Sequence, residues 1–336
     1  MVVSQFQDGT LTERHLSREM LGVVEATAIA AARTMGNGDE VEVDRAARTA
    51  MHECLEQITM EGEIVIGETK LPEIPGLKSG ETVGQGSPPS ISRTDIALNA
   101  VEGAKLVAKG LPNAISCIAL SSSGGLFKAP ECYMRKLIVG PLAKGKVDIN
   151  APVRYNLSII AMSLERNIED ITVVILDRPR HDELIAQVRD CGARIKLIAD
   201  GDVMPAITTC LSGAGIHAVM GIGGAPQGVL AAAAVKCLGG EIQTQLCWFD
   251  DEQRKTIEAF GIDADPDNVY LMDDLVPGDE IVFAASGVTH GDTLKGVRYF
   301  GSGARTHSIV MTLKSGLIRF VDTVHLHADN RGPVKI

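Results

Sequence analysis

The sequence lacks closely spaced cysteines. Its 336 residues include seven cysteines, but no two of them have the C-x-x-C spacing, and several lie in apolar runs. Scattered cysteines in apolar surroundings are typical of small buried side chains in a reducing compartment. We therefore expect no disulfide framework.

An excess of basic residues is also missing. The chain has 32 Lys and Arg against 43 Asp and Glu, which gives a formal net charge of −11. Proteins that bind the phosphate backbone of nucleic acids concentrate Lys and Arg, so we expect no nucleic-acid partner. An acidic surface mostly favours solubility and says little about other partners.

No apolar run approaches the length of a membrane span, and so we expect no membrane partner. The first residues, Met1 to Asp8, have neither the basic region nor the apolar core of a signal peptide. Together with the scattered cysteines, these absences predict a cytoplasmic protein.

What is present is the composition of an ordinary globular protein. Hydrophobic residues make up 45% of the chain and charged residues 22%. A chain of this length suits one large α/β unit or two intimate domains, with ample material for a buried core.

Two helices are predicted at the start of the chain. Thr10 to Glu13 has the pattern of a capping box, apolar residues follow at helical spacing, and Gly36 and Gly38 end this helix. Asp44 is predicted to open the second helix. Beyond it we expect strands over 63–67, 114–121 and 136–140, with a long Pro- and Gly-rich surface excursion over 71–92.

Later in the chain, strands and helices alternate. Predicted strands cover 171–176, 194–198 and 217–221, and predicted helices cover 181–190, 204–211 and 228–238. This order predicts βαβ units on a largely parallel sheet. A strand over 281–286 and a hairpin of 308–314 with 317–326 follow. We place the boundary between the two halves near 167, as 1–167 and 168–336, with a return of the chain to the first half left open.

The segment Asp95-Ile-Ala-Leu-Asn-Ala-Val-Glu-Gly-Ala104 resembles a known metal-binding turn. It is similar to Asp-Pro-[Ile/Leu]-[Asp/Glu]-Gly-[Thr/Ser] in the fructose-1,6-bisphosphatase and inositol-monophosphatase superfamily. The resemblance implies that the aspartate and an acidic partner hold Mg²⁺ or Mn²⁺ and that the hydroxyl positions the attacking water. Glu102 and Gly103 match, whereas Asn99 stands at the aspartate position and Ala104 at the hydroxyl position.

Further segments, in order along nearly the whole chain, resemble the class II fructose-1,6-bisphosphatases of bacteria. They are Gly62-Glu-Ile-Val-Ile-Gly-Glu68, Ala129-Pro-Glu-Cys-Tyr-Met-Arg-Lys-Leu-Ile-Val-Gly140, Arg178-Pro-Arg-His-Asp182, Asp200-Gly-Asp202 and Gly221-Ile-Gly-Gly-Ala-Pro-Gln-Gly228. The resemblance implies an α/β, layered sugar-phosphatase-like fold with two halves around a cleft. It also implies a homo-oligomer, a dimer or a tetramer.

Substrate residues are predicted mainly in the second half. Arg178 and Arg180 stand at the carboxyl end of a predicted strand, where α/β proteins tend to bind ligands, and an arginine fork suits phosphate oxygens. The glycine-rich segment 221–228 joins a strand to a helix, so it is either an anion cradle or a tight turn that needs glycine. The resemblance implies a substrate-binding set of Glu102, Gly103, Tyr133, Arg178, Arg180, Asp200, Asp202 and Gly224.

The metal shell implied by the resemblance is altered. Asp44, Glu68 and Glu102 match acidic positions of the family, but Gln227 stands where the family has a glutamate. Neutral amides attract Mg²⁺ and Mn²⁺ less than carboxylates do. Glu40 replaces a family lysine and is either a substitute ligand or a solvated acid beside a helix start. Glu68, Asn99 and Ala104 thus occupy the catalytic positions, the last two in degenerate form.

Two functions from different classes follow from this pattern. The first is a divergent metal-dependent phosphatase of carbohydrate metabolism and gluconeogenesis, which uses Mn²⁺ or Mg²⁺ to hydrolyse the 1-phosphate of fructose 1,6-bisphosphate or sedoheptulose 1,7-bisphosphate. The second is a catalytically inactive homologue, a pseudoenzyme that binds sugar phosphate as a regulatory or partner subunit. A purely structural subunit leaves the matching substrate segments unexplained.

Overall fold

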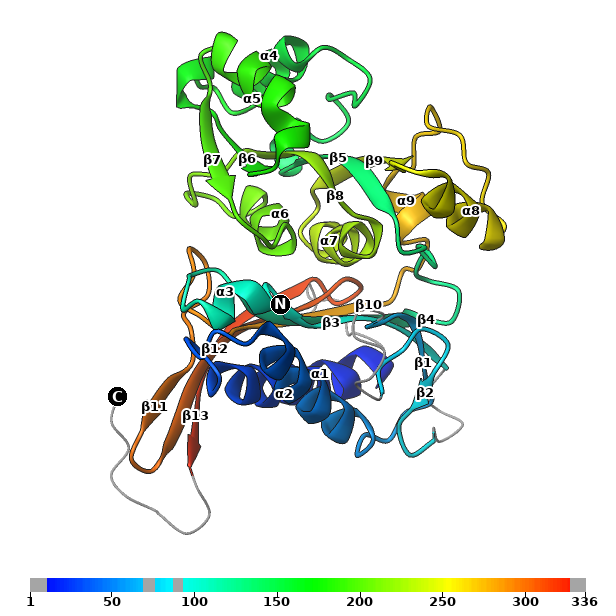
Figure 1. Cartoon of the computed structure of the whole chain (residues 1–336), viewed down its shortest axis with the longest axis vertical. Helices are drawn as coiled ribbons and strands as arrows, with labels where there is room; N and C mark the ends of the chain where they lie inside the picture. Colours follow the sequence, from blue (N-terminus) through cyan, green and yellow to red (C-terminus); the bar gives the residue numbers. More distant parts are fainter. Residues whose placement is uncertain (1–10, 69–75, 87–92, 327–336) are drawn as a thin grey trace, which may run out of the picture. The chain divides into compact units, whose positions relative to one another are not determined.

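The structure, a computed structural model, describes residues 11–68, 76–86 and 93–326 (Figure 1). The chain forms two compact units, one of Met1–Ser123 with Asp279–Ile336 and one of Gly124–Gly278. These bounds differ from the predicted halves 1–167 and 168–336, because residues 124–167 belong to the second unit and the chain returns to the first unit at Asp279. Along the described residues no helix is both long enough and apolar enough to cross a bilayer.

The first unit is built on a mixed sheet with the strand order β11-β12-β10-β4-β3-β1-β2, and β13 pairs with β12. Strands β1 and β3 run parallel, whereas β4, β10 and β12 follow one another antiparallel. The predicted strands 63–67 and 114–121 and the predicted C-terminal hairpin are confirmed. The strands are β1 (Gly62–Ile66), β2 (Thr82–Val83), β3 (Thr94–Glu102), β4 (Ile115–Ser122), β10 (Ile281–Gly287), β11 (Arg298–Phe300), β12 (Gly303–Thr312) and β13 (Leu317–Leu326).

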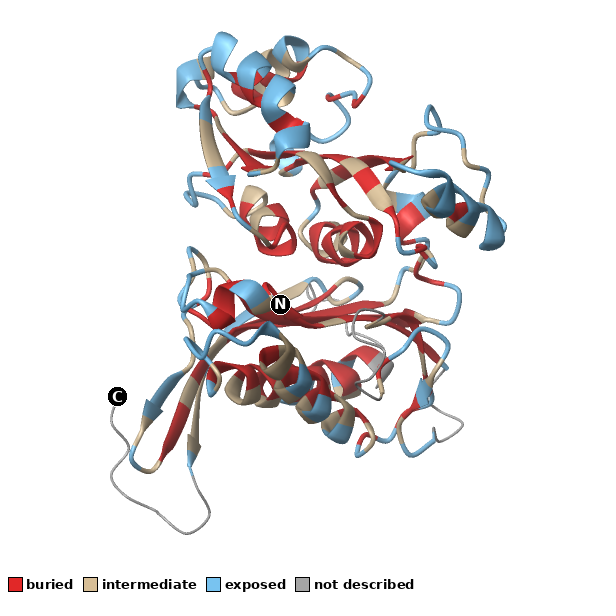
Figure 2. Ribbon diagram, in the orientation of Figure 1, coloured by how far each residue is buried: buried red, intermediate tan, exposed pale blue. Residues whose placement is uncertain are grey.

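Helices α1 (Leu11–Ala32) and α2 (Glu40–Leu55) cover one face of this sheet (Figures 1 and 2). Their apolar residues recur at helical spacing and are buried against the strands, which makes the core of the unit. The predicted start of the second helix at Asp44 is wrong. Asp39 is the N-cap, since its side chain accepts hydrogen bonds from the backbone N–H groups of Val41 and Glu42, so Asp44 lies one turn inside the helix. The capping box predicted at Thr10 lies outside the described residues.

The second unit has a mixed sheet of order β7-β6-β8-β5-β9. Only β7, β6 and β8 are mutually parallel, while β5 is antiparallel to both β8 and β9, so the prediction of a largely parallel sheet holds for part of it. The strands are β5 (Tyr133–Val139), β6 (Thr172–Leu176), β7 (Arg194–Ile198), β8 (Ala218–Gly224) and β9 (Glu241–Cys247).

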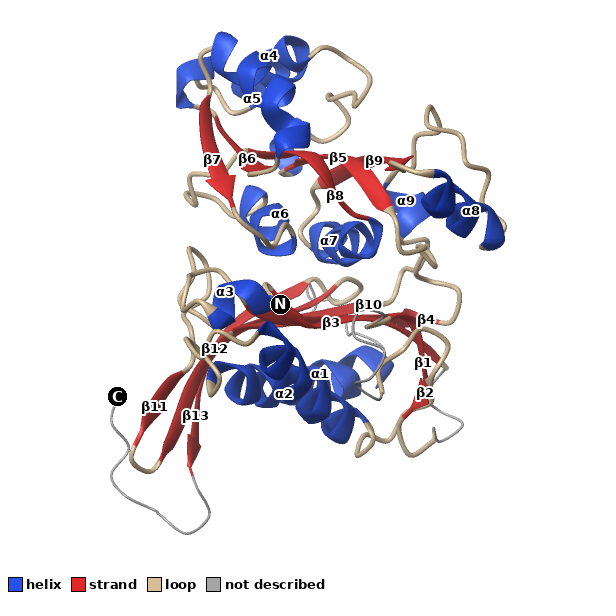
Figure 3. Cartoon of the chain, viewed as in Figure 1, coloured by secondary structure: helices blue, strands red, loops and turns tan. Residues whose placement is uncertain are grey.

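Helices cover both faces of this second sheet (Figure 3). Helices α4 and α5 pack on one face and α6 and α7 on the other, with α8 and α9 beyond β9. Their bounds are α4 (Val153–Ser163), α5 (Asp182–Asp190), α6 (Val203–Thr209), α7 (Ala225–Cys237), α8 (Asp251–Ala259) and α9 (Met272–Leu275), with short 3-10 turns η2 (Pro141–Ala143), η3 (Ile168–Asp170) and η4 (Pro179–His181). Helix α7 begins three residues before the predicted start at Gly228, because Pro226 fits its first turn.

Candidate functional site

The predicted metal turn lies where the parallel strands β1 and β3 end. Ile66 is paired with Ala97, so the residues that follow β1 come to lie beside the end of β3. The register of β3 against β4 shifts between Asn99 and Glu102, which frees backbone groups of β3 from the ladder. In this shifted stretch the Ala100 N–H donates a hydrogen bond to Glu68 Oε1 at 2.8 Å.

Glu68 and Glu102 both lie near Cys117, which faces Asn99 in the β3–β4 ladder. Burial is the main cause that raises the pKa of the Cys117 thiol well above its ordinary value, and the charges of Glu102 and Glu68 raise it further. Glu102 is itself 4% exposed. The structure thus brings Glu68, Asn99 and Glu102 together around one buried thiol.

Gly103 and Ala104 continue this turn into the short helix α3 (Ala104–Ala108). Gly103 has a φ of 91°, and a Cβ there would lie 2.9 Å from Leu106 Cδ1, so the position requires glycine. Ala104 is the first residue of the helix and packs against the core. The predicted hydroxyl position therefore carries a methyl group in apolar surroundings.

Asp44 already has a cationic neighbour on its own helix. Arg48 Nη1 lies 3.3 Å from Asp44 Oδ2, the Arg48 side chain is fully buried, and its Nη2 donates to the Gly76 carbonyl at 3.2 Å. Glu40 is the first residue of α2, exposed, and one turn before Asp44. The arginine, not foreseen from the sequence, contacts one oxygen of the carboxylate that was expected to bind a metal ion.

The acidic residues do not form a metal-binding group in the part of the chain that the structure describes. No set of three or more His, Cys, Asp or Glu side chains there is arranged to hold an ion. Mg²⁺ and Mn²⁺ need several hard oxygen ligands around one point. Gln227, the neutral member of the predicted shell, lies in the first turn of α7 in the other unit. The described His, Cys, Asp and Glu side chains therefore offer no ready-made set of three ligands, and a divalent ion there would need further oxygen ligands from amides or water.

The second unit brings several predicted substrate residues together. Tyr133 and Gly224 face each other in the β5–β8 ladder. Arg180 stacks over the Tyr133 ring at 5.1 Å, and its Nε and Nη2 donate to the Ile222 carbonyl at 3.3 and 2.9 Å. Phe249 meets the Tyr133 ring edge-on at 5.1 Å. A guanidinium group is thus held over an aromatic surface at the end of β8.

Asp202 lies at the same end of the sheet, bound to a lysine. Lys136 Nζ lies 2.7 Å from Asp202 Oδ2, and the two side chains are 1% and 8% exposed. A Cβ on Gly223 would lie 2.3 Å from that same oxygen, so this glycine makes room for the ion pair. One oxygen of Asp202 is thereby occupied by Lys136.

Arg178 and Asp200 each form a hydrogen bond with an adjacent residue in the chain. Arg178 Nη1 donates to the Asp177 carbonyl at 2.8 Å, and Asp200 Oδ1 accepts from the Gly201 N–H at 3.0 Å. The glycine-rich segment contains no loop, because Gly221 to Gly224 belong to β8 and Ala225 begins α7. The segment is therefore a strand that passes directly into a helix.

The sequence did not identify Lys136, His181 and Phe249 as members of the group of side chains around Tyr133, Arg180 and Asp202. The first two do carry a signal, since Lys136 is a charged residue that begins the apolar run 136–140 and His181 directly follows Arg180. Phe249 carries none, because its contact with Tyr133 joins two segments far apart in the chain.

Known proteins resemble this chain over nearly its full length. The sequence model of the family described as "Bacterial fructose-1,6-bisphosphatase, glpX-encoded" matches residues 14–325. A D-fructose 1,6-bisphosphatase class 2/sedoheptulose 1,7-bisphosphatase of Synechococcus sp. (strain JA-2-3B'a(2-13)) is 46% identical over 94% of this chain and 96% of its own. Proteins of the same name from Crocosphaera subtropica and Synechocystis sp. are 46% and 44% identical, over 94% and 93% of this chain and 97% and 96% of their own. The chain belongs to the glpX-encoded bacterial fructose-1,6-bisphosphatase family.

Proposed function

We propose that this family member hydrolyses the 1-phosphate of fructose 1,6-bisphosphate or sedoheptulose 1,7-bisphosphate. The observation that carries the proposal is the identity of 44 to 46% with proteins named for these two activities, over nearly the full length of both chains. The convergence of Arg180, Tyr133 and Gly224 at one end of a sheet supports it, because a guanidinium group is suited to phosphate oxygens.

In this proposal the substrate is held mainly by the second unit. Arg178 and Arg180 bind phosphate oxygens, Tyr133 contacts the sugar, and Asp200 and Asp202 accept hydrogen bonds from its hydroxyls, with Gly224 close to the ligand. Glu102 and Gly103 complete the substrate set. A water molecule attacks phosphorus in line, the P–O bond to C1 breaks, and the products are the sugar monophosphate and inorganic phosphate, without a covalent enzyme intermediate.

The family is one of metal-dependent phosphatases, and Mg²⁺ or Mn²⁺ is the ion that we propose for this member. Asp44, Glu68 and Glu102 are its charged candidates, Glu40 is a substitute, and Asn99 and Gln227 offer only neutral oxygens. We also propose a cytoplasmic homo-oligomer, a dimer or a tetramer, which sedimentation of the purified protein would test.

Phosphate release is the direct test of hydrolysis. The purified protein is supplied with each bisphosphate and with Mg²⁺ or Mn²⁺, and the Glu102→Gln variant serves as the control. Phosphate release by wild type that is lost in Glu102→Gln supports the proposed phosphatase activity. Absence of release with either substrate and either ion would overturn it.

A second candidate is an inactive homologue that binds sugar phosphate as a regulatory or partner subunit. It is favoured by the neutral side chains of Asn99, Ala104 and Gln227 and by the buried Arg48 beside Asp44. Calorimetric binding of a bisphosphate without phosphate release is its expected result. The combined change Asn99→Asp, Ala104→Thr and Gln227→Glu should then raise phosphate release above background, and release by the unaltered protein contradicts this candidate.

A further inference from the structure

Strands β6 and β8 separate just before the residues that form the candidate substrate site. Their parallel pairing joins Val173 to Ala218 and Val174 to Val219. Beyond this point β6 continues to Leu176 and β8 to Gly224. The pairing between the two strands therefore stops before their carboxyl ends.

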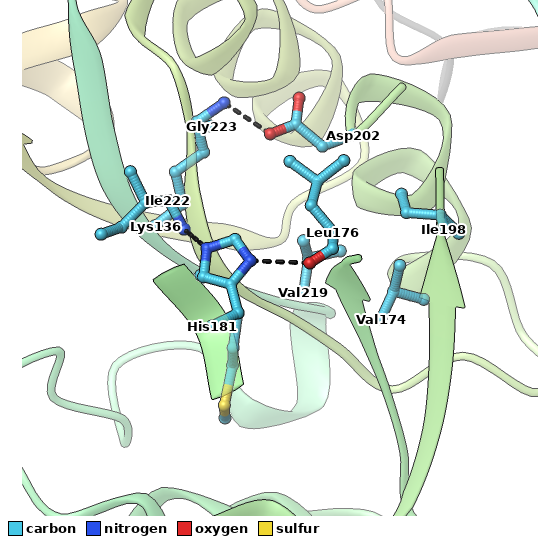
Figure 4. Close-up of a pocket in the computed structure, with 11 residues that line it drawn as sticks. Lys136, Val174, Leu176, His181, Ile198, Asp202, Val219, Ile222 and Gly223 are labelled. Carbon is cyan, nitrogen blue, oxygen red and sulfur yellow. Dashed lines mark hydrogen bonds and ion pairs between the residues drawn. The ribbon is translucent and has the colours of Figure 1, made fainter. Parts of the chain in front are cut away.

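The imidazole ring of His181 connects the ends of these two strands (Figure 4). His181 is 2% exposed, its Nδ1 lies 2.7 Å from the Leu176 carbonyl oxygen, and its Nε2 accepts the Ile222 N–H at 2.7 Å. The Ile222 N–H can only donate, so Nε2 carries no proton. Nδ1 must then hold the proton and donate to Leu176, which defines the neutral ring and one tautomer.

Both backbone polar groups of Ile222 are bound by neighbouring residues of the η4 turn. His181 accepts from its N–H, and Arg180 donates to its carbonyl through Nε and Nη2. Gly221 packs against the ring, since it has a φ of 130° and a Cβ there would lie 3.0 Å from Nε2. Arg180 therefore binds the end of β8 directly, and the neighbouring His181 ring joins the same residue of β8 to the end of β6.

We infer that His181 is a positioning residue that helps to hold Arg180 and the end of β8 for the sugar phosphate, and that protonation of its ring weakens this hold by removing the bond to the Ile222 N–H. The inference rests on the proposed function, because that function makes Arg180 and Gly224 substrate residues. A protonated ring donates from both nitrogens, so Nε2 could no longer accept the Ile222 N–H.

Titratable and charged groups around His181 favour the neutral ring. Burial is the main cause that lowers the pKa of His181 below its ordinary value, and the charges of Arg180 and Arg178 lower it further. Lys136 and Asp202 also line the small cavity beside the ring, and these two are paired with each other. Because the folded pKa is depressed, the bridge is present at neutral pH and is lost as the pH falls through that value.

Two substitutions separate the roles of the ring. His181→Gln supplies a donor and an acceptor on one carboxamide and does not titrate near neutral pH, whereas His181→Phe keeps a ring of similar size and loses both groups. His217 is a matched control, because its Nδ1 accepts the Thr172 N–H at 2.9 Å at the opposite end of β6. His217→Phe removes a comparable bond away from Arg180.

Calorimetric binding of fructose 1,6-bisphosphate to the full chain, from pH 8 to pH 5, measures the effect. At pH 8 we expect His181→Phe to bind about tenfold more weakly than wild type, and His181→Gln and His217→Phe to bind within about threefold of it. As the pH falls, protonation of the phosphate groups of the ligand should weaken binding to both proteins. Wild type should lose more affinity than His181→Gln, because only wild type has the His181 ring to protonate. Equal affinity of His181→Phe and wild type, or equal acid loss in wild type and His181→Gln, would overturn the inference.

Amide hydrogen exchange of the ligand-free proteins gives a second readout. His181→Phe should exchange faster than His181→Gln in peptides covering 178–182 and 218–224, and His217→Phe should not accelerate either region. If the exchange rates of these peptides are the same in His181→Phe and His181→Gln, His181 does not hold the two strand ends together. This result stands even where no ligand binds. Failure of wild type to bind at any pH overturns the proposed function and the role toward substrate, while the exchange comparison still decides whether His181 holds the two strands.

Discussion

Asp44 and Arg48 form an ion pair within one turn of α2, in a place where the family resemblance implies a metal ligand. The Arg48 side chain is fully buried and that of Asp44 is 13% exposed, so water screens the pair only weakly. A divalent ion at Asp44 must therefore compete with a guanidinium group that the fold already holds there.

Arg48→Met tests this competition. The substitution leaves the Asp44 carboxylate without its arginine in a mostly buried place, so we expect the free energy of unfolding to fall by about 2–3 kcal/mol in metal-free buffer. Mn²⁺ should then raise the melting temperature of the variant more than that of wild type, because the Arg48 guanidinium no longer competes with it for Asp44. Urea unfolding and thermal melts with and without Mn²⁺ measure both effects.

Arg45→Met is the matched control, because Arg45 pairs with Glu42 on the same helix with both side chains about half exposed. Its unfolding free energy should change by less than about 0.5 kcal/mol and its response to Mn²⁺ should equal that of wild type. An identical Mn²⁺ response in all three proteins would contradict the competition.

For this ion pair, the sequence predicts the spacing of the two residues but not their burial. The spacing of Asp44 and Arg48 places them on one face of a helix, which is visible in the sequence. Whether that face is solvated or buried depends on contacts with distant segments, such as the Gly76 carbonyl that Arg48 also binds. A burial that depends on a residue 28 positions away cannot be seen in local periodicity.

Among the elements, α2 depends on its N-cap. Asp39→Ala removes the side-chain acceptor of two backbone N–H groups, so the unfolding free energy should fall by about 1 kcal/mol. Asp39→Asn keeps a capping oxygen and should lose less than half of that amount. Urea denaturation followed by circular dichroism compares the two variants, and equal losses would show that charge rather than capping matters there.

The turn between β3 and α3 depends on Gly103. Gly103→Ala places a Cβ at a φ of 91° and close to Leu106, so we expect a loss of about 1–2 kcal/mol in unfolding free energy. Gly22→Ala is the control, since Gly22 lies inside α1 and a Cβ there has no neighbour within 4 Å. That substitution should be neutral or stabilising, and a loss equal to that of Gly103→Ala would contradict the conformational argument.

Element boundaries followed from the sequence where one local signal was dominant. The strand 194–198 was predicted with its observed bounds, since turn residues flank it. The start of α2 was misplaced because Asp39 and Asp44 both precede helix-forming residues, and only the cap geometry distinguishes them. The antiparallel neighbours of β5 were not foreseen, because alternation along the chain does not identify the strand beside it.

For the whole molecule, the division into two units does not follow the order of the chain, because the first unit is made of two separate segments. The sequence predicts a boundary near 167 and leaves a return of the chain to the first half open. The return is observed, because β10 pairs with β4 and β12 with β10, so the segment after Asp279 completes the first sheet. The pairing of β10 with β4 joins residues more than 150 positions apart and leaves no local pattern. The resemblance to a family did predict the layered α/β fold, because matching segments span both units.

Residues 124–278 should fold as an isolated polypeptide, because they have their own sheet and their own hydrophobic core. Far-ultraviolet circular dichroism should show mixed α/β structure with one cooperative thermal transition. The unit contains Tyr133, Arg178, Arg180, Asp202 and Gly224, so calorimetry should still detect fructose 1,6-bisphosphate, and Arg180→Ala in the same polypeptide should weaken that binding about tenfold or more. A polypeptide without a cooperative transition would contradict its independence, and a folded one that binds no ligand would show that residues of the other unit are required.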